Sequence, residues 1–179
     1  MKVRLVLPLL VGLLLAGCAS APETDSYTHR ATLSGPDMDI TLDNLLESSE
    51  DRSYLAWLSA VRIRDDLWNA RYYLEVRYEG ASDAGYIDLA PGETLLLSVD
   101  GELLRFRGLG SDATRHETRR GTFVENALYE VKPEVIKQIA AANEVKVQIN
   151  GQARKLYREF KPINFQKFRN FVLTHMGGF

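Results

Sequence analysis

"RYYLEVRYE", residues 71–79, is the stretch that decides the fold class, because its side chains alternate between two faces with a period of two. One face is apolar or aromatic, and the other carries mainly arginine and glutamate. This alternation is typical of a β-strand with one buried and one solvated face. The residues predicted to point inward are Tyr72, Leu74, Val76 and Tyr78, with Arg71, Tyr73, Glu75, Arg77 and Glu79 pointing outward.

The segment before this strand also predicts a strand, with a helix as the alternative. Residues Tyr54 to Arg64 are mostly apolar, and the polar sequence after them supplies a turn. A helix over Tyr54 to Trp68 is the competing prediction, because a short apolar run does not separate the two by its period. For residues 41–50 the sequence allows either a helical turn or a loop.

Three further strands are predicted between residues 85 and 108. Gly85 to Ala90 forms the first, Pro91–Gly92 the turn after it, and Asp100–Gly101 separates the second from the third. Asp-Gly between two apolar runs is among the strongest short signals for a β-hairpin. We therefore expect antiparallel pairing in this part of the chain.

The last third of the chain predicts two helices and three strands. Pro133 suits the first position of a helix over residues 133–143, and Asn143 can end it in a left-handed conformation. A second helix is predicted over residues 164–176, with Asn164 as its cap. Strands are predicted over residues 127–132, 145–149 and 153–160, the last two joined by a turn at Asn150–Gly151.

Together these elements predict an α+β domain: a mainly antiparallel β-sheet of meanders and hairpins, with two helices in the C-terminal half packed on one face. We assign residues 39–179 to this single domain. Residues 18–38 are rich in small and polar residues and predict a flexible tether, with an edge strand at Tyr27 to Leu33 as the alternative.

Residues 1–17 predict a secretory signal peptide. Lys2 and Arg4 precede an apolar run from Leu5 to Ala16, and small residues follow at its end. A transmembrane helix is the alternative, but it needs about 20 apolar residues, and this run is shorter and contains Pro8. The sequence therefore predicts export from the cytoplasm.

Leu15-Ala16-Gly17-Cys18 resembles the lipobox of bacterial lipoproteins, in which a leucine and two small residues precede a cysteine. The resemblance implies that diacylglycerol is attached to Cys18, that a dedicated signal peptidase cuts after Gly17, and that the new amino group is acylated. Two or three acyl chains hold a protein stably on a membrane. Ala19–Ser20 lacks the aspartate of an inner-membrane retention signal, so the resemblance implies the periplasmic face of the outer membrane.

The charge of the exported chain argues against nucleic acid as a partner. Lys2 and Arg4 are removed with the signal peptide, which leaves 20 of the 22 basic residues and all 24 acidic residues. The exported chain therefore has a net charge of −4, whereas nucleic-acid binding favours a basic surface. The implied partners are instead the membrane, through the lipid on Cys18, the lipoprotein-processing enzymes, and a periplasmic protein. Cys18 is the only cysteine, so no disulfide is expected.

No catalytic, metal or cofactor motif stands out in the sequence. His29, His116 and His175 lack the short spacing of zinc ligands, so we expect no metal and no cofactor. Residues 108–112 have the wrong order for the serine of a hydrolase turn, and Asp65–Asp66 suits a solvated turn. The sequence therefore predicts no catalytic residue.

The most unusual segment is "GLGSDATRHETRRG", residues 108–121. It is long and polar for a loop in a small domain, and it carries Arg115, His116, Arg119 and Arg120. One interpretation is a solvated hairpin loop. The other is a recognition loop for an anionic group or an acidic partner protein, because arginine forks suit carboxylates and phosphates.

We therefore expect a lipid-anchored, non-enzymatic module of the cell envelope that binds a periplasmic component through a sheet edge or through this loop. Beyond the lipobox, the chain resembles small envelope lipoproteins of unknown function in architecture alone. The alternative is a small periplasmic hydrolase or ligand carrier whose site no motif reveals. A concave apolar pocket with a perturbed acid or histidine is typical of the alternative, and a filled core is typical of the module.

Changing Cys18→Ser should leave an uncleaved precursor without lipid, because a hydroxyl is a far poorer nucleophile than a thiolate near neutral pH. Mass spectrometry of the membrane form measures the outcome. The wild-type chain should begin at Cys18 and carry the mass of its acyl chains. An unmodified Cys18, or a mature chain that begins elsewhere, would contradict the lipoprotein interpretation.

Overall fold

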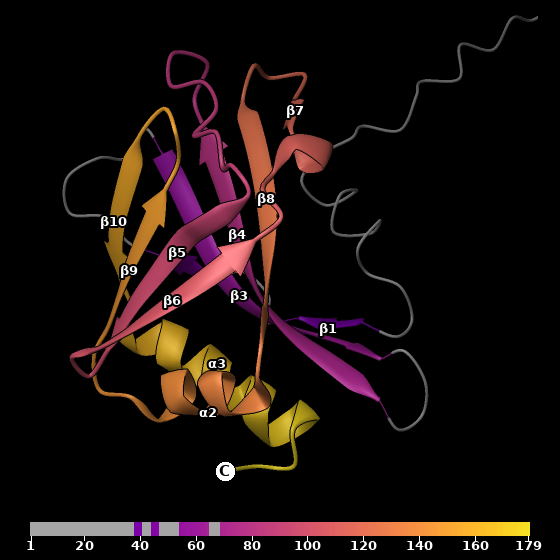
Figure 1. Ribbon diagram of the computed structural model, residues 1–179, viewed down its shortest axis with the longest axis vertical. Helices are drawn as coiled ribbons and strands as arrows, with labels where there is room; N and C mark the ends of the chain where they lie inside the picture. The colour runs from indigo at the N-terminus through magenta and orange to yellow at the C-terminus, as the bar shows by residue number, and fades with distance from the viewer. Residues whose placement is uncertain (1–37, 41–43, 47–53, 65–68) are drawn as a thin grey trace, which may run out of the picture.

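The computed structural model describes residues 38–40, 44–46, 54–64 and 69–179. These residues form two antiparallel sheets and two α-helices (Figure 1), so the predicted α+β class is confirmed. The two helices pack together on one side of the molecule, below the sheets in Figure 1. The predicted signal peptide, Cys18 and the alternative strand at residues 27–33 lie outside the described residues.

The larger sheet, called sheet A here, contains β1 (Met38–Ile40), β2 (Leu45–Leu46), β3 (Tyr54–Arg64), β4 (Ala70–Gly80), β7 (His116–Glu117) and β8 (Phe123–Val131). Their order is β1-β3-β4-β8-β7, and β2 also pairs with β3. The long β3–β4 pair forms the centre, with Tyr54 opposite Gly80 and Arg64 opposite Ala70. β4 and β8 confirm the strands predicted at residues 71–79 and 127–132.

The smaller sheet, sheet B, contains β5 (Gly92–Val99), β6 (Glu102–Gly108), β9 (Val145–Asn150) and β10 (Lys155–Glu159), in the order β10-β9-β5-β6. The predicted β5–β6 hairpin is confirmed. Its turn residues Asp100 and Gly101 both have a positive φ, of 47° and 90°, as a tight hairpin turn requires. The strands predicted at residues 145–149 and 153–160 are confirmed as β9 and β10.

The first helix, α2 (Pro133–Ala141), confirms the predicted helix but not its predicted end. The expectation of a left-handed Asn143 is wrong, because Ala142 leaves the helix in an extended conformation with φ −65° and ψ 158°. The Asp100 carboxylate accepts the N–H of Asn143 at 2.9 Å and that of Glu144 at 2.7 Å. These bonds tie the β5–β6 hairpin to the chain that follows α2.

The second helix, α3 (Pro162–His175), begins two residues before Asn164, so the prediction of Asn164 as the cap residue is wrong. Asn164 lies in the first turn of the helix, and its side-chain oxygen accepts the Lys161 N–H at 2.7 Å. The same buried amide donates to the Asn44 side-chain oxygen at 2.9 Å and to the Leu45 carbonyl at 2.8 Å. This pair of buried amides fixes β2 to the start of α3.

One hydrophobic cluster fills the space between the two sheets and the helices. The aromatic residues of α3 predicted to lie in the core, Phe165, Phe168 and Phe171, are buried there. Tyr129 of β8 and Thr94 of β5 link the sheets across this core through a 2.8 Å hydrogen bond between their hydroxyls. Burial raises the pKa of the Tyr129 hydroxyl to about 12.

The edge strands of sheet B also contact sheet A. Arg158 of β10 donates to the Tyr157 carbonyl at 2.8 Å and to the Tyr54 carbonyl of β3 at 3.1 Å, which joins β10 to β3. On the other side, Gly108 of β6 lies so close to β8 that an ideal Cβ would be 2.8 Å from the Tyr129 ring. Gly108 therefore permits the close approach of β6 to β8.

The strand predicted at residues 85–90 is wrong, because this segment crosses from sheet A to sheet B without pairing to a strand. Asp88 has a φ of 65°, which interrupts an extended chain. The Asp88 and Ile87 carbonyls accept N–H groups from the β9–β10 turn, and the Leu89 carbonyl accepts the N–H of Ser111. We call residues 85–91 the crossover.

The alternatives for residues 41–68 are resolved where the structure describes them. Residues 54–64 form β3, so the alternative helix is wrong there, and Leu45–Leu46 form a strand rather than a helical turn or a loop. The predicted solvated face of β4 is also wrong in part, because Glu75 and Arg77 are only 5% and 9% exposed. Arg77 is partly covered by its neighbours: its guanidinium lies 4.9 Å from the Trp57 ring centre and pairs with Glu79 at 3.0 Å.

Gly151, in the β9–β10 turn, should not tolerate a side chain, because an ideal Cβ there would lie 2.0 Å from the Ile87 carbonyl oxygen. We expect Gly151→Ala to lower the free energy of unfolding by about 2 kcal/mol through overpacking. Gly177→Ala is the control: nothing lies within 4 Å of its Cβ position, so it should cost about 1 kcal/mol for its positive φ. Urea unfolding measures the free energy of unfolding of both variants. Equal decreases would show that the backbone at Ile87 can move enough to accept the added methyl group.

Candidate functional site

The structure divides the predicted recognition segment, residues 108–121, into two parts. The first contains the short helix η1 (Asp112–Thr114) and Arg115, and the second is the β7–β8 hairpin with a turn over residues 118–121. Arg115 contacts acidic groups of its own chain, whereas Arg119 and Arg120 are exposed on the turn. The four predicted residues therefore do not act as one surface.

Arg115 is an internal cation of the fold. Its guanidinium pairs with Asp88 of the crossover and with Asp112 at 3.0 Å, and its Nε lies 3.5 Å from a Glu125 oxygen. The guanidinium also lies 5.8 Å from the centre of the Tyr86 ring. Desolvation lowers the pKa of Arg115, but the hydrogen bond with Asp88 and the three carboxylates outweigh it and raise the pKa above its ordinary value.

The Glu125 carboxylate lies among these groups and is fully buried. Its Oε1 accepts the Asp88 N–H at 2.8 Å, and its Oε2 accepts the Leu89 N–H at 3.1 Å and the Ser111 hydroxyl at 2.5 Å. These donors and Arg115 compensate a charge that would otherwise be costly to bury. We call Asp88, Ser111, Arg115 and Glu125 the Glu125 cluster.

Ser111 beside a carboxylate has one contact expected of a hydrolase nucleophile, but its position does not fit that chemistry. Ser111 is fully buried, and a nucleophile must reach its substrate. Its hydroxyl donates to Glu125, and its Oγ accepts the Arg115 Nε–H at 3.2 Å. These contacts fix the crossover and η1 against β8, so the cluster has a structural role.

His116 and Thr114 hold the start of the β7–β8 hairpin. His116 is half-buried, and its Nδ1 lies 3.3 Å from the Thr114 carbonyl oxygen. The Thr114 hydroxyl donates to the Asn126 carbonyl at 2.5 Å and lies 3.2 Å from the Asn126 backbone nitrogen. The hairpin therefore leaves from a point fixed on β8.

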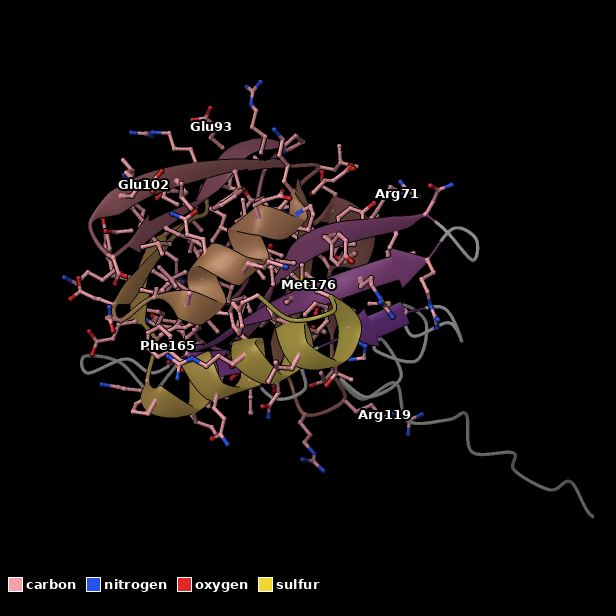
Figure 2. The ribbon with its side chains drawn as sticks, turned by 90° about the horizontal axis from the view of Figure 1, so that it is seen from below. Arg71, Glu93, Glu102, Arg119, Phe165 and Met176 are labelled. Carbon is pink, nitrogen blue, oxygen red and sulfur yellow. The ribbon has the colours of Figure 1, made fainter. Side chains whose placement is uncertain are left out.

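Arg119 and Arg120 occupy the tip of this hairpin. The Gly121 N–H binds the Thr118 carbonyl at 2.9 Å, and the Thr118 N–H binds the Thr122 carbonyl at 2.8 Å. Gly121, with a φ of 73°, supplies the left-handed position that follows such a turn. Both arginines are exposed, and Figure 2 shows Arg119 at the periphery of the molecule.

The chain enters sheet A at the end opposite this turn. Met38 of β1 lies opposite Ile63 near the end of β3, whereas Tyr54 at its start aligns across β4 with Phe123, at the base of the turn. The residues from Tyr54 to Ile63 span about 30 Å along the strand. Figure 1 shows the same arrangement, with β7 at the upper end and β1 lower down.

Comparisons with protein-family models, curated proteins and solved structures found no match. No group of three or more His, Cys, Asp or Glu side chains within the described ranges could hold a metal ion. None of the helices in this part of the chain is long and apolar enough to cross a membrane. The function of the site therefore rests on its own geometry.

Sequence reasoning missed three members of the Glu125 cluster. The sequence contains a signal for Glu125, because this residue lies on the same face of β8 as the buried residues Ala127 and Tyr129, and an acidic residue there needs partners. It contains no signal for Asp88 or Ser111, because these residues lie 37 and 14 positions from Glu125 in the sequence. Only the folded chain brings them together.

Arg115→Ala should lower the free energy of unfolding by about 2 to 3 kcal/mol, because it removes the cation beside the buried Glu125 carboxylate. The matched control changes both Arg119 and Arg120 to Ala, and each exposed substitution should stay within about 0.5 kcal/mol. Urea unfolding followed by tryptophan fluorescence measures both variants. Equal destabilisation would contradict the division of the segment into an internal and an exposed part.

Proposed function

We propose that this protein is a lipid-anchored, non-enzymatic binding module of the cell envelope, held on the periplasmic face of the outer membrane through Cys18. It recognises an acidic periplasmic protein through Arg119 and Arg120. The observation that carries the proposal is the position of these two exposed arginines on a defined turn, about 30 Å along sheet A from the entry of the chain.

The lipobox pattern at residues 15–18 supports the anchor, and the chain length after it fits a surface-held domain. Met38, the first residue of β1, lies twenty positions after Cys18. The predicted tether spans about 25 Å as a flexible chain of that length. The entry end of sheet A would then lie nearer the bilayer, with the turn directed toward the periplasm.

The construction of the turn supports recognition rather than a simple connection. The hydrogen bonds of Thr118 and Gly121 fix its backbone, and Thr114 fixes its base on β8. A preformed turn loses little conformational entropy when a partner binds. The guanidinium groups that this turn carries suit carboxylates, because each can donate two parallel hydrogen bonds.

The alternative of a hydrolase or ligand carrier gains no support from the Glu125 cluster. Ser111 and Glu125 are fully buried, and the contacts of their polar atoms stay within the fold. Burial of this kind stabilises structure and leaves no route to a substrate. The binding function therefore has the better support.

Changing Arg119→Ser together with Arg120→Ser should reduce crosslinking of the protein to its partner in intact cells. The difference between the wild type and the variant should be smaller at high salt, because screening over about 8 Å at physiological ionic strength, and over less at higher salt, already weakens the charge pairs of the wild type. Crosslinked yield on denaturing gels, at low and high salt, measures the outcome.

The matched control for this experiment is Lys132→Ser with Lys155→Ser, which removes the same charge from exposed positions before α2 and on β10. Membrane fractionation of each variant reports the anchor separately from binding. Equal crosslinked yields for the turn variant and the wild type at both salt concentrations would remove Arg119 and Arg120 as the recognition site.

A further inference from the structure

We infer that β6 is a docking edge for an extended acidic segment of a partner protein, which adds to sheet B beside β6. In strand addition, backbone hydrogen bonds supply affinity and alternate side chains supply specificity. This inference deepens the proposed binding function by naming a second contact surface. It depends neither on the lipid at Cys18 nor on the Arg119–Arg120 turn.

β6 is the longest edge strand of the two sheets as described. Among the described strands, β6 pairs with β5 alone. The backbone N–H and C=O groups on the other side of β6 therefore form no hydrogen bonds to a neighbouring strand. β6 has seven residues, whereas the sheet A edges β1 and β7 have three and two. β10, the opposite edge of sheet B, is protected, because Arg158 donates to the Tyr157 carbonyl.

The inner side of β6 is apolar and incompletely covered at one position. Phe106 is buried, with 8% of its surface exposed, whereas Leu104 is only half-buried against the core. Gly108 lies against β8, so the open stretch of the edge is the part that begins at Glu102. An added strand would cover Leu104 with an apolar side chain.

The outer side of β6 carries Leu103, Arg105 and Arg107 in alternate positions, all exposed, with Leu103 at 53%. Neither arginine forms an ion pair with an acidic residue in the described part of the chain. Glu93 lies opposite Arg107 on β5, but the register shifts between Glu93 and Leu95. Two acidic residues spaced two apart on an added strand would face these arginines.

The two arginines select the occupant of this edge. An antiparallel pair of two β6 strands would bring the arginines of both copies close together, and like charges on neighbouring strands are destabilising. An acidic strand avoids this repulsion and compensates both cations. Figure 2 shows Glu102, at the start of β6, in the outer layer of the molecule on the side away from α3, and its carboxylate accepts the Gln138 side-chain amide of α2 at 2.7 Å.

The test uses the full chain, purified in detergent, and a fluorescent peptide of alternating glutamate and valine residues. Fluorescence anisotropy measures binding, and hydrogen exchange followed by mass spectrometry locates it. We expect the peptide to bind, with slower exchange in β6, and to bind several-fold more weakly in about 0.5 M salt, where charges are strongly screened. A peptide with lysine in place of glutamate should not bind.

The decisive variant changes Arg105→Glu and Arg107→Glu, and it should weaken peptide binding about tenfold or more. Its matched control changes Lys146→Glu and Lys155→Glu, two exposed cations of sheet B that lie on β9 and β10. The control carries the same change in charge and should alter binding less than about twofold. Urea unfolding verifies that both variants are folded.

Several outcomes would overturn the inference. These are no peptide binding, equal losses in the two variants, equal binding of the lysine peptide, or protection that falls outside β6. Self-association through β6 in sedimentation without peptide would assign the edge to a second copy. The variant with both Arg119 and Arg120 changed to Ser should keep peptide binding, so that failure of the turn proposal is distinguished from failure of this one.

Discussion

The buried carboxylate of Glu125 is the constraint on which the arrangement of the two sheets depends. A buried carboxyl group needs hydrogen-bond partners inside the protein, and Glu125 accepts the backbone N–H groups of Asp88 and Leu89 and the hydroxyl of Ser111. Because the first two donors belong to the crossover, this requirement fixes the path from sheet A to sheet B. The sheets are thus joined by a polar contact as well as by the core.

Arginine has two different uses in this molecule. Arg115, which is half-buried, and Arg158, which is buried, contact carboxylates or backbone carbonyls of their own chain. Arg105 and Arg107 are exposed, as are the arginines of the β7–β8 turn, and they suit recognition of an acidic partner. The type of residue is the same in both places, and burial decides which use it has.

The polar contacts at the ends of elements share a common physical purpose. Asp100 accepts the N–H groups of Asn143 and Glu144, and Asn164 joins Asn44 to the start of α3. Each contact satisfies backbone or amide groups that leave regular structure, where an unpaired group would cost free energy. These contacts fix the β5–β6 turn to the chain after α2, and β2 to the start of α3.

The sequence by itself determined the α+β class, the strands β4 and β8, the β5–β6 hairpin and both helices, because these depend on local period and turn chemistry. It left β3 open between a strand and a helix, and the structure decided for the strand. Only the tertiary structure decided that residues 85–90 cross between sheets, since the partners of Asp88 and Leu89 lie on β8. It also decided that Arg115 is internal while Arg119 and Arg120 are exposed. Arg119 lies only four positions after Arg115 and has the same chemistry, and only the contacts of the folded chain place Arg115 beside Glu125 while Arg119 and Arg120 are exposed.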